Sequence, residues 1–214
     1  MKRLLLTLLG LAGLLILAQI VLRVFLQLRR TPIPPAFGFL LSSGWRRLYR
    51  DPERTLAPLD IQPGMTVLEV GPGVGTFSVE AARRVGAGGK LIGVDIQPAF
   101  LEQTSLTVDA AGARQVELYS ADVTSLPLER DSVDRAFLIA VLPEVPNIAG
   151  ALAEIHRVLK PDGLLMISEE IIEPEYVPAA VTERWATRAG FELVSRHGNA
   201  FCYSLLFRSR PVKV

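Results

Sequence analysis

The sequence predicts an α/β fold in which a doubly wound, mostly parallel seven-stranded sheet ends in an antiparallel hairpin and follows one transmembrane helix. Apolar strand-like runs alternate with helical patterns from residue 59 onward, and a glycine-rich loop follows the first run. A long uncharged stretch lies near the N-terminus. We therefore expect an anchor over 1–30, a proline spacer with an amphipathic interfacial segment over 31–58, and a globular domain over 59–214.

The anchor is predicted from residues 4–22, a run without charge in which Thr7 and Gln19 are the only polar residues. A helix of this length spans about 28 Å, close to the ~30 Å hydrocarbon core of a bilayer. A cleaved signal peptide is the competing interpretation, but its apolar region is only about 7–15 residues long. Because apolar residues continue here toward Arg29 and Arg30, an uncleaved single-pass anchor is favoured.

Charge is distributed unevenly along the chain. Residues 1–50 hold eight Lys or Arg and no Asp or Glu, whereas the remainder has a net charge near −7. This pattern favours a membrane-facing head, with the lipid bilayer as partner, and argues against binding of nucleic acid. The positive-inside bias places the globular domain on the cytoplasmic side of the cell membrane. One cysteine and two histidines give no metal-ligand cluster, so no metal is expected.

The segment between anchor and domain allows two interpretations. Pro32, Pro34 and Pro35 predict a stiff, extended spacer that ends the preceding helix. Residues 36–50 then place aromatic and aliphatic side chains among arginines at near-helical spacing. Such a segment suits the bilayer interface, or it covers the pocket of the globular domain.

The elements of the globular domain follow from their patterns. A buried strand over 65–70 precedes a helix over 76–86 that ends at a glycine, and a second strand covers 90–96. The next helix has proline in its first turn and glycine after its end. The remaining elements are helices at 98–112, 147–160 and 178–189 and strands at 115–122, 133–142 and 163–170. Continuous apolar strands in regular βα repeats indicate a Rossmann-like parallel sheet covered on both faces.

The last two strand-like runs are separated by residues 197–199, which include a glycine. A short loop of this kind predicts an antiparallel hairpin. A doubly wound sheet that ends in such a hairpin differs from the usual dinucleotide-binding arrangement.

Three glycines, Gly71, Gly73 and Gly75, lie between the first strand and the first helix. Because glycine is entropically costly, such a run marks a sharp bend or a close approach to a ligand. Ligands of open α/β sheets bind at the carboxyl ends of the strands, and helix N-termini attract anions. The dinucleotide fingerprint is not met, since Thr76 occupies the place of its last glycine, and no P-loop motif is present.

Three carboxylates accompany the loop. Glu69 lies inside an apolar strand, where a charge is costly unless it is paired. Asp95 ends the second strand, where a carboxylate can bind both hydroxyls of a ribose, and Asp122 ends the third. Any one of these three carboxylates could simply be a solvent-exposed acidic residue at the start of a loop. Together with the glycine loop they favour a single ligand site.

Four segments resemble, in order and spacing, the class I S-adenosylmethionine-dependent methyltransferases. They read VLEVGPGVGTFS, LIGVDIQ, SADVTSLPLERDSVDRAFLIAVL and IHRVLKPDGLLMISE. The nearest branch is that of the ubiquinone and menaquinone methyltransferases, of the methyltransferase type 11 group. The resemblance covers residues 59–207 and implies S-adenosyl-L-methionine as cofactor, and it is poorly specific for the acceptor.

The resemblance assigns the methionine part of the cofactor to the glycine loop. Gly71, Gly73 and Gly75 would wrap the methionine, and Glu69 would fix the loop and the amino end of the cofactor through hydrogen bonds. Ala140, after the fourth strand, would lie near the transferred methyl.

The same resemblance assigns the adenosine part to the next two strand ends. Asp95 would hold the ribose hydroxyls, and Ile96 would pack on the adenine. Asp122 would accept a hydrogen bond from the adenine amino group, while the backbone of Val123 reads the ring edge.

Transfer of an activated methyl needs mainly alignment of the acceptor, and a general base only where the acceptor loses a proton. Glu144 is the first candidate base, with Tyr176, His197 and Tyr203 as alternatives, although a packing or surface role is an alternative for each. The anchor favours a membrane methyltransferase with a hydrophobic or lipid-like acceptor. A cofactor-binding scaffold and an enzyme with a small soluble acceptor remain open, and the oligomeric state is not predicted.

Overall fold

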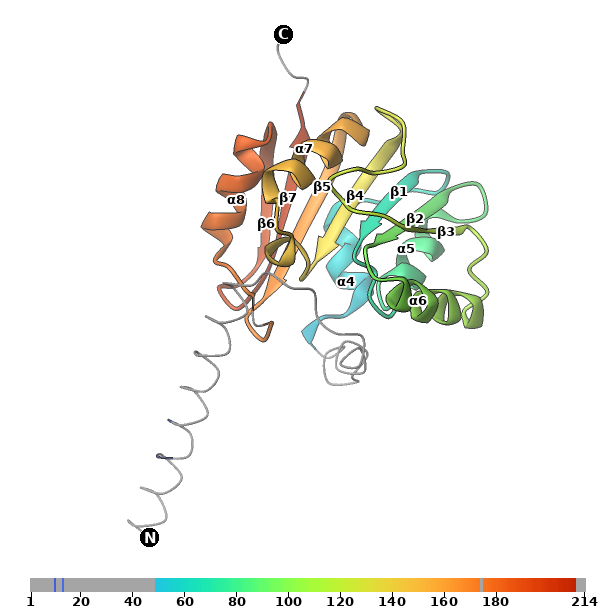
Figure 1. Ribbon diagram of the computed structural model, residues 1–214, viewed down its shortest axis with the longest axis horizontal. Coiled ribbons are helices and arrows are strands. Elements are labelled where there is room, and N and C mark those ends of the chain that lie inside the picture. Colours follow the sequence, from blue (N-terminus) through green and yellow to red (C-terminus); the bar gives the residue numbers. More distant parts are fainter. Residues whose placement is uncertain (1–9, 11–12, 14–48, 174, 211–214) are drawn as a thin grey trace.

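Seven strands form one sheet in the order β3-β2-β1-β4-β5-β7-β6 (Figure 1). The computed structural model describes residues 10, 13, 49–173 and 175–210. Strands β1 to β5 are parallel and β7 is antiparallel to both neighbours, which confirms the predicted mixed sheet. The strands are β1 Thr66–Val70, β2 Lys90–Asp95, β3 Val116–Ser120, β4 Val133–Ile139, β5 Leu159–Glu170, β6 Phe191–Gly198 and β7 Cys202–Ser209.

Helices cover both faces of the sheet, as the continuous apolar strands predict. Helices α7 and α8 pack on one face, and α4, η2 and α5 pack on the other, with α6 beside α5 (Figure 1). The helices are α4 Pro52–Leu56, α5 Ser78–Val85, α6 Pro98–Ala110, α7 Ile148–Val158 and α8 Ala179–Arg188, with short 3-10 turns η2 Ala57–Leu59 and η3 Leu142–Glu144.

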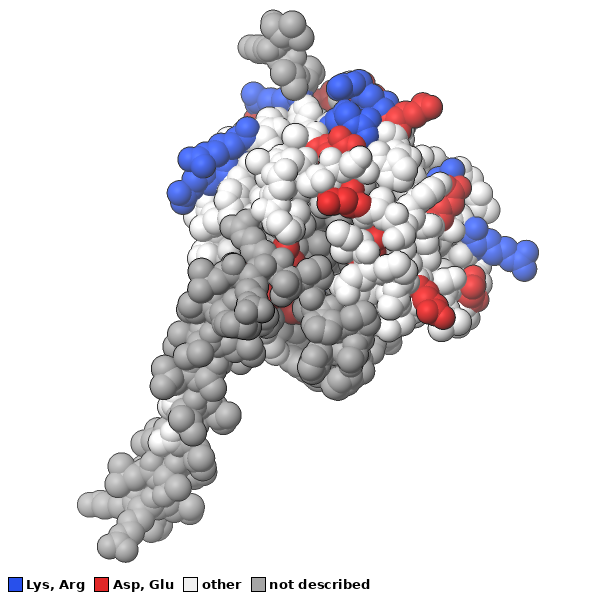
Figure 2. All heavy atoms as spheres, viewed as in Figure 1, with Lys and Arg blue, Asp and Glu red and all other residues white. Residues whose placement is uncertain are grey.

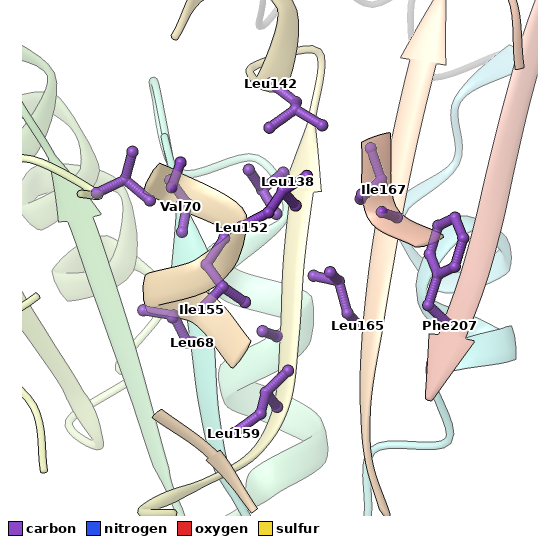
Figure 3. Close-up of a cluster of buried hydrophobic side chains, with 14 of the residues drawn as sticks. Leu68, Val70, Leu138, Leu142, Leu152, Ile155, Leu159, Leu165, Ile167 and Phe207 are labelled. Atoms are coloured by element: carbon purple, nitrogen blue, oxygen red, sulfur yellow. The ribbon is translucent and has the colours of Figure 1, made fainter. Parts of the chain in front are cut away.

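The larger hydrophobic core lies beneath α7 (Figure 3). Leu152 and Ile155 of this helix are fully buried against Leu68 of β1, Leu138 of β4 and their neighbours. The helix thus spans the centre of the sheet, where β1 lies between β2 and β4. This packing fixes the strand ends that carry the candidate site.

Two element ends differ from the predictions. Strand β4 stops at Ile139 rather than at residue 142, because Ala140 adopts a left-handed backbone with φ 57°. The hairpin turn lies at 199–201, so His197 and Gly198 still belong to β6. The Asn199 side chain accepts hydrogen bonds from the backbone N–H groups of residues 201 and 202, so the turn closes two residues later than expected.

The packed body begins before residue 59. Leu56 of α4 and Leu59 of η2 are fully buried in the second core, so the expected boundary at 59 falls inside this region. Arg50, only 3% exposed, already contacts β7 through a hydrogen bond to the Cys202 sulfur.

The predicted anchor and most of the spacer lie outside the described residues. Gly10 and Gly13 are helical and exposed. In the part of the chain that the structure describes, no helix is both long and apolar enough to span a membrane. On the face seen in Figure 2, basic side chains lie mainly toward the outer margin of the described part, and acidic side chains are scattered among the uncharged residues.

Replacing Leu152 with alanine tests the core beneath α7. Because the side chain is fully buried, Leu152→Ala should lower the free energy of unfolding by about 2–5 kcal/mol. Leu106→Ala on α6, where the leucine is 68% exposed, is the matched control and should have little effect. Urea unfolding measures both, and equal losses would contradict this account of the core.

Candidate functional site

A cleft opens at the carboxyl ends of β1, β2 and β4, where the strand order reverses. The space in and in front of the cleft, which includes open solvent at its mouth, is about 1250 Å³. This is the place where ligands bind in open α/β sheets. The lining comes from 69–74, 76–77, 94–97, 100, 121–123, 139–141 and 144–146.

The glycine loop bends sharply over the end of the sheet. Gly71, Gly73 and Gly75 have left-handed φ angles of 70°, 58° and 80°. The Gly71 N–H donates to the carbonyl of Val94 at 2.8 Å, and a Cβ on Gly71 would lie 2.5 Å from Cγ2 of Val141. Both the bend and the close packing therefore require glycine at position 71.

Gly75 occupies a different place from the other two glycines. It is not among the lining residues of the cleft, although it was expected to wrap the methionine. A Cβ on Gly75 would lie 3.2 Å from Cβ of Thr107 and 3.3 Å from Cα of Thr104. Its lack of a side chain therefore lets helix α6 approach the loop.

Two threonines of α6 hold the loop, and the sequence analysis did not find them. Thr104 Oγ1 donates to the carbonyl of Gly73 at 2.9 Å, and Thr107 Oγ1 donates to that of Val74 at 2.8 Å. Their spacing of three puts both on one face of the helix. Two polar residues on one face of the predicted helix 98–112 were the available signal.

Glu69 is buried beneath the loop, with 2% of its surface exposed. Ser78 Oγ donates to its Oε2 at 2.6 Å, which ties β1 to helix α5. Burial raises the pKa of Glu69 to about 8; the Ser78 hydrogen bond opposes this shift and the charge of Asp95 adds to it. This carboxyl group therefore keeps its proton to a higher pH than an exposed glutamate does.

Asp95 is the last residue of β2 and faces the glycine loop. Burial raises its pKa, while backbone N–H groups of Gln97, Ile96 and Gly73 lower it. The bond from Gln97 N to Oδ1 is 2.9 Å long. Ile96 lies at the cleft with 57% of its surface exposed. A carboxylate and an exposed apolar side chain thus stand side by side.

Asp122 and Val123 form the next part of the lining. Strand β3 ends at Ser120, so Asp122 lies two residues beyond the strand that it was expected to end. Its Oδ1 accepts hydrogen bonds from N and Oγ1 of Thr124, both at 2.8 Å, and these bonds lower its pKa. Val123 is 8% exposed. The adenine contacts assigned to these two residues stay predictions.

Ala140 and Glu144 complete the cleft on the β4 side. The left-handed Ala140 donates its N–H to the carbonyl of Ser168 at 2.8 Å, which fixes the bend after β4. Glu144 lies in η3, half-buried, and both residues line the cleft. Eight of the nine residues expected to bind the cofactor, all except Gly75, therefore meet with Glu144 in one cavity.

The alternative bases lie elsewhere, since none of them lines the cleft. Tyr203 Oη donates to the carbonyl of Val177 at 2.9 Å, and Tyr176 Oη donates to that of Ala200. His197 contacts the hydroxyl of Ser195 at 2.8 Å. These side chains belong to the hairpin and its surroundings.

Glu169 is a buried carboxyl that the sequence analysis missed. It is 1% exposed and lies one step beyond the Ile139–Ser168 pair, so that it neighbours Ala140 on the adjacent strand. Burial raises its pKa well above the usual range; the charge of Arg50 opposes the shift and that of Glu144 adds to it. An acidic pair at the end of an apolar strand was the available signal.

The charge and shape of the cleft fit S-adenosylmethionine. Its lining holds the carboxyl groups of Glu69, Asp95, Asp122 and Glu144, and none of the described lining residues is lysine, arginine or histidine. Such a lining complements a ligand with a sulfonium and an ammonium group. The left-handed loop leaves room for close backbone approach, and the apolar remainder suits an adenine ring.

Comparison with known proteins agrees with this geometry. A family profile described as a methyltransferase domain matches residues 68–167. The chain is 30% identical over 132 residues to a demethylmenaquinone methyltransferase of Bacillus cereus (strain B4264). The aligned region is 62% of this chain and 53% of the relative. It is 40% identical over 114 residues to an uncharacterized 37.1 kDa protein in transposon TN4556 of Streptomyces fradiae, covering 53% of this chain and 32% of the relative.

The chain thus spans about half and about a third of the lengths of these two relatives. Among solved structures, a SAM-dependent methyltransferase from Aquifex aeolicus superposes with a TM-score of 0.78 at 24% identity, over 83% of this chain and all of that one. The cofactor implied by this domain and fold is S-adenosyl-L-methionine. Residues 68–167 therefore form a methyltransferase domain, and the chain is built on the fold of the class I S-adenosylmethionine-dependent methyltransferases.

Proposed function

We propose that the protein transfers a methyl group from S-adenosylmethionine to a hydrophobic, lipid-like acceptor at a membrane. One observation carries the transfer: the left-handed glycine loop, Glu69 and Asp95 meet in a single cleft at the carboxyl edge of the sheet. The acceptor class and the membrane location are supported by the apolar wall of the cleft and by the composition of residues 1–50.

Different residues of the cleft would bind different parts of the cofactor. Asp95 would accept hydrogen bonds from the two ribose hydroxyls, and Gly71 and Gly73 would let the backbone approach the methionine. Glu69, which Ser78 holds beneath the loop, would bind the amino end of the cofactor. The bound cofactor supplies a methyl group on a cationic sulfur, so the protein has mainly to align the acceptor with it.

The part of the cleft lining that lies between the carboxyl groups is largely apolar. Phe77, Phe100, Ile139 and Val145 belong to it. Such a wall suits a hydrophobic ring or chain. The name of the Bacillus cereus relative, a demethylmenaquinone methyltransferase, points to a quinone-like acceptor.

Glu144 is our candidate for a proton acceptor. Its backbone N–H donates to the carbonyl of Val141 at 3.0 Å, which holds η3 at the cleft on the β4 side. If the acceptor atom carries a proton, the Glu144 carboxylate would take it while the acceptor bonds to the methyl carbon and the bond from that carbon to the sulfonium sulfur breaks, which leaves a neutral thioether. The charge of Glu144, in turn, adds to the rise in the pKa of the buried Glu169.

Incubation with methyl-labelled S-adenosylmethionine tests the proposed activity. The full-length protein is supplied with membrane lipids in one reaction and with water-soluble metabolites in another, and labelled products are identified by mass spectrometry. We expect label in a lipid-soluble product. Label only in a small polar product would favour the soluble acceptor, and cofactor binding without any labelled product would favour the scaffold.

Removing the Asp95 carboxylate should weaken cofactor binding. Hydrogen bonds to a charged group contribute about 1.5–3 kcal/mol each, so Asp95→Ala should raise the Kd for S-adenosylmethionine at least tenfold. Asp109→Ala at the exposed end of α6 should leave it unchanged. Calorimetric titration gives the Kd, and thermal melting without ligand confirms the fold. An unchanged Kd in Asp95→Ala would show that the cofactor lies elsewhere.

The raised pKa of Glu69 makes the stability of the ligand-free protein depend on pH. Between its ordinary value of 4.5 and about 8, the folded protein binds this proton and the unfolded chain does not. The free energy of unfolding must therefore fall as the pH rises through this window, by up to ~1.4 kcal/mol per pH unit from this group.

Glu69→Gln removes the part of this pH dependence that comes from Glu69. The free energy of unfolding of the variant should therefore fall less steeply between pH 5 and about 8 than that of the native protein. Asp95 and Glu169 add slopes of the same sign, and these remain in both proteins. Glu102→Gln, at an exposed site on α6, should follow the native protein. Denaturation at a series of pH values measures the slopes, and parallel curves for Glu69→Gln and the native protein would rule out the raised pKa.

A further inference from the structure

Four large apolar side chains are exposed together at one edge of the body: Tyr49 (39%), Ile171 (39%), Ile172 (44%) and Phe201 (63%). The N–H of Ile171 donates to the carbonyl of Phe201 at 2.7 Å, which joins the end of β5 to the hairpin turn. Tyr49 lines a small cavity with Cys202, the residue after Phe201. We call these four residues the rim patch.

The described part of the chain has eight exposed large hydrophobic residues, and four of them form the rim patch. Isolated exposed apolar residues are common on soluble proteins, whereas clusters of them mark interaction surfaces.

The rim patch lies at the same edge of the sheet as the cleft. Strands β4 and β5 are parallel, so Ile171 after β5 is at the edge where Ala140 follows β4. Neighbouring strands are about 4.8 Å apart, so the patch begins close to the wall of the cleft. Ile96, a fifth exposed apolar residue, lines the cleft at this edge.

The rim patch is also where the N-terminal head joins the body. Residues 1–48 precede Tyr49 and contain seven Lys or Arg, no Asp or Glu, and the uncharged run 4–22. A bilayer that holds this head therefore holds the body by the edge that carries the rim patch. No other described edge of the body is tied to the apolar head by the chain.

The charges around the rim patch favour apolar insertion over attraction to anionic lipids. The segment 169–176 reads EEIIEPEY and the segment 198–203 reads GNAFCY, so neither contains a basic residue. Arg50, next to Tyr49, is buried, and its guanidinium lies 3.5 Å from the Glu170 carboxylate. Isoleucine, phenylalanine and tyrosine at such a site can enter the boundary between head groups and acyl chains.

We propose that the body inserts the rim patch into the surface of a lipid bilayer, so that the cleft opens beside the lipid. The acceptor then reaches the methyl group laterally from the membrane. This use of the patch rests on the proposed methyl transfer to a lipid-like acceptor, while the lipid contact itself can be measured separately.

An environment-sensitive fluorophore tests the insertion in the full-length protein. Cys202→Ser removes the single cysteine, and Ile172→Cys, Phe201→Cys or Glu129→Cys then provides one labelling site. Glu129 is exposed in the loop before β4, at the opposite edge of the sheet, and serves as the matched control. Each protein is labelled with a nitrobenzoxadiazole dye and mixed with phosphatidylcholine vesicles, with or without doxyl-labelled lipid.

We expect dyes at 172 and 201 to shift to shorter wavelength with vesicles and to lose emission to the doxyl lipid, while the dye at 129 does neither. Three results would overturn the proposal: no association with vesicles, bound protein with unquenched dyes at 172 and 201, or a shift without vesicles that grows with protein concentration. The last would assign the patch to a second copy of the chain.

Titration of the same labelled proteins with S-adenosylmethionine separates this inference from the proposed function. Quenching at 172 and 201 without cofactor binding would leave the lipid contact standing and remove the methyl transfer. Cofactor binding without quenching at 172 and 201 would remove the lipid contact and leave the methyl transfer standing.

Discussion

The turn after β1 is the constraint on which the rest of the site depends. The chain must leave the centre of the sheet and enter α5 while staying in contact with β2 and with the segment after β4. The hydrogen bond from Gly71 to Val94 ties the turn to β2, and Val141 packs where a side chain on Gly71 would lie. A left-handed glycine satisfies both demands. The cleft exists because the backbone can bend this closely over the strand ends.

The turn is supported from below and from the side. Beneath it, the buried Glu69 accepts a hydrogen bond from Ser78 and so joins β1 to α5. Beside it, Thr104 and Thr107 bind two carbonyl groups of the loop, and Gly75 lets α6 come near enough for them to do so. A loop that is held by α6 and follows a strand tied to α5 has a fixed geometry, and precise alignment of a methyl group requires such a geometry.

Much of this organisation follows from local sequence pattern. The strands and helices around the loop show the spacing of apolar residues that is typical of each element. Each carboxylate lies at or near the end of a strand, so it could be predicted that the carboxylates meet at one edge of the sheet. The role of Gly75 could not, because a glycine beside a ligand and a glycine beside a helix look alike in sequence. Ala140 falls within the predicted strand 133–142, whereas its left-handed backbone goes with a tertiary hydrogen bond from its N–H to the carbonyl of Ser168.

The burial of Glu169 was the other feature that the sequence analysis missed. Glu169 belongs to an acidic pair at the end of the predicted strand 163–170, and the packing of β5 against its neighbours shows that it is fully enclosed. The two tyrosines considered as bases likewise take their roles from long-range packing: the Tyr203 hydroxyl donates to the carbonyl of Val177, before α8, and the Tyr176 hydroxyl donates to that of Ala200, in the hairpin turn. Long-range packing of this kind leaves little local signal.

A crystal structure with S-adenosylhomocysteine would test the central claim most directly. The account predicts that this ligand lies in the cleft at the carboxyl edge of β1 and β2, with both ribose hydroxyls about 2.5–3.0 Å from the Asp95 carboxylate. Its amino acid part should contact the backbone at Gly71 and Gly73. A ligand bound elsewhere, or one whose ribose avoids Asp95, would contradict the account.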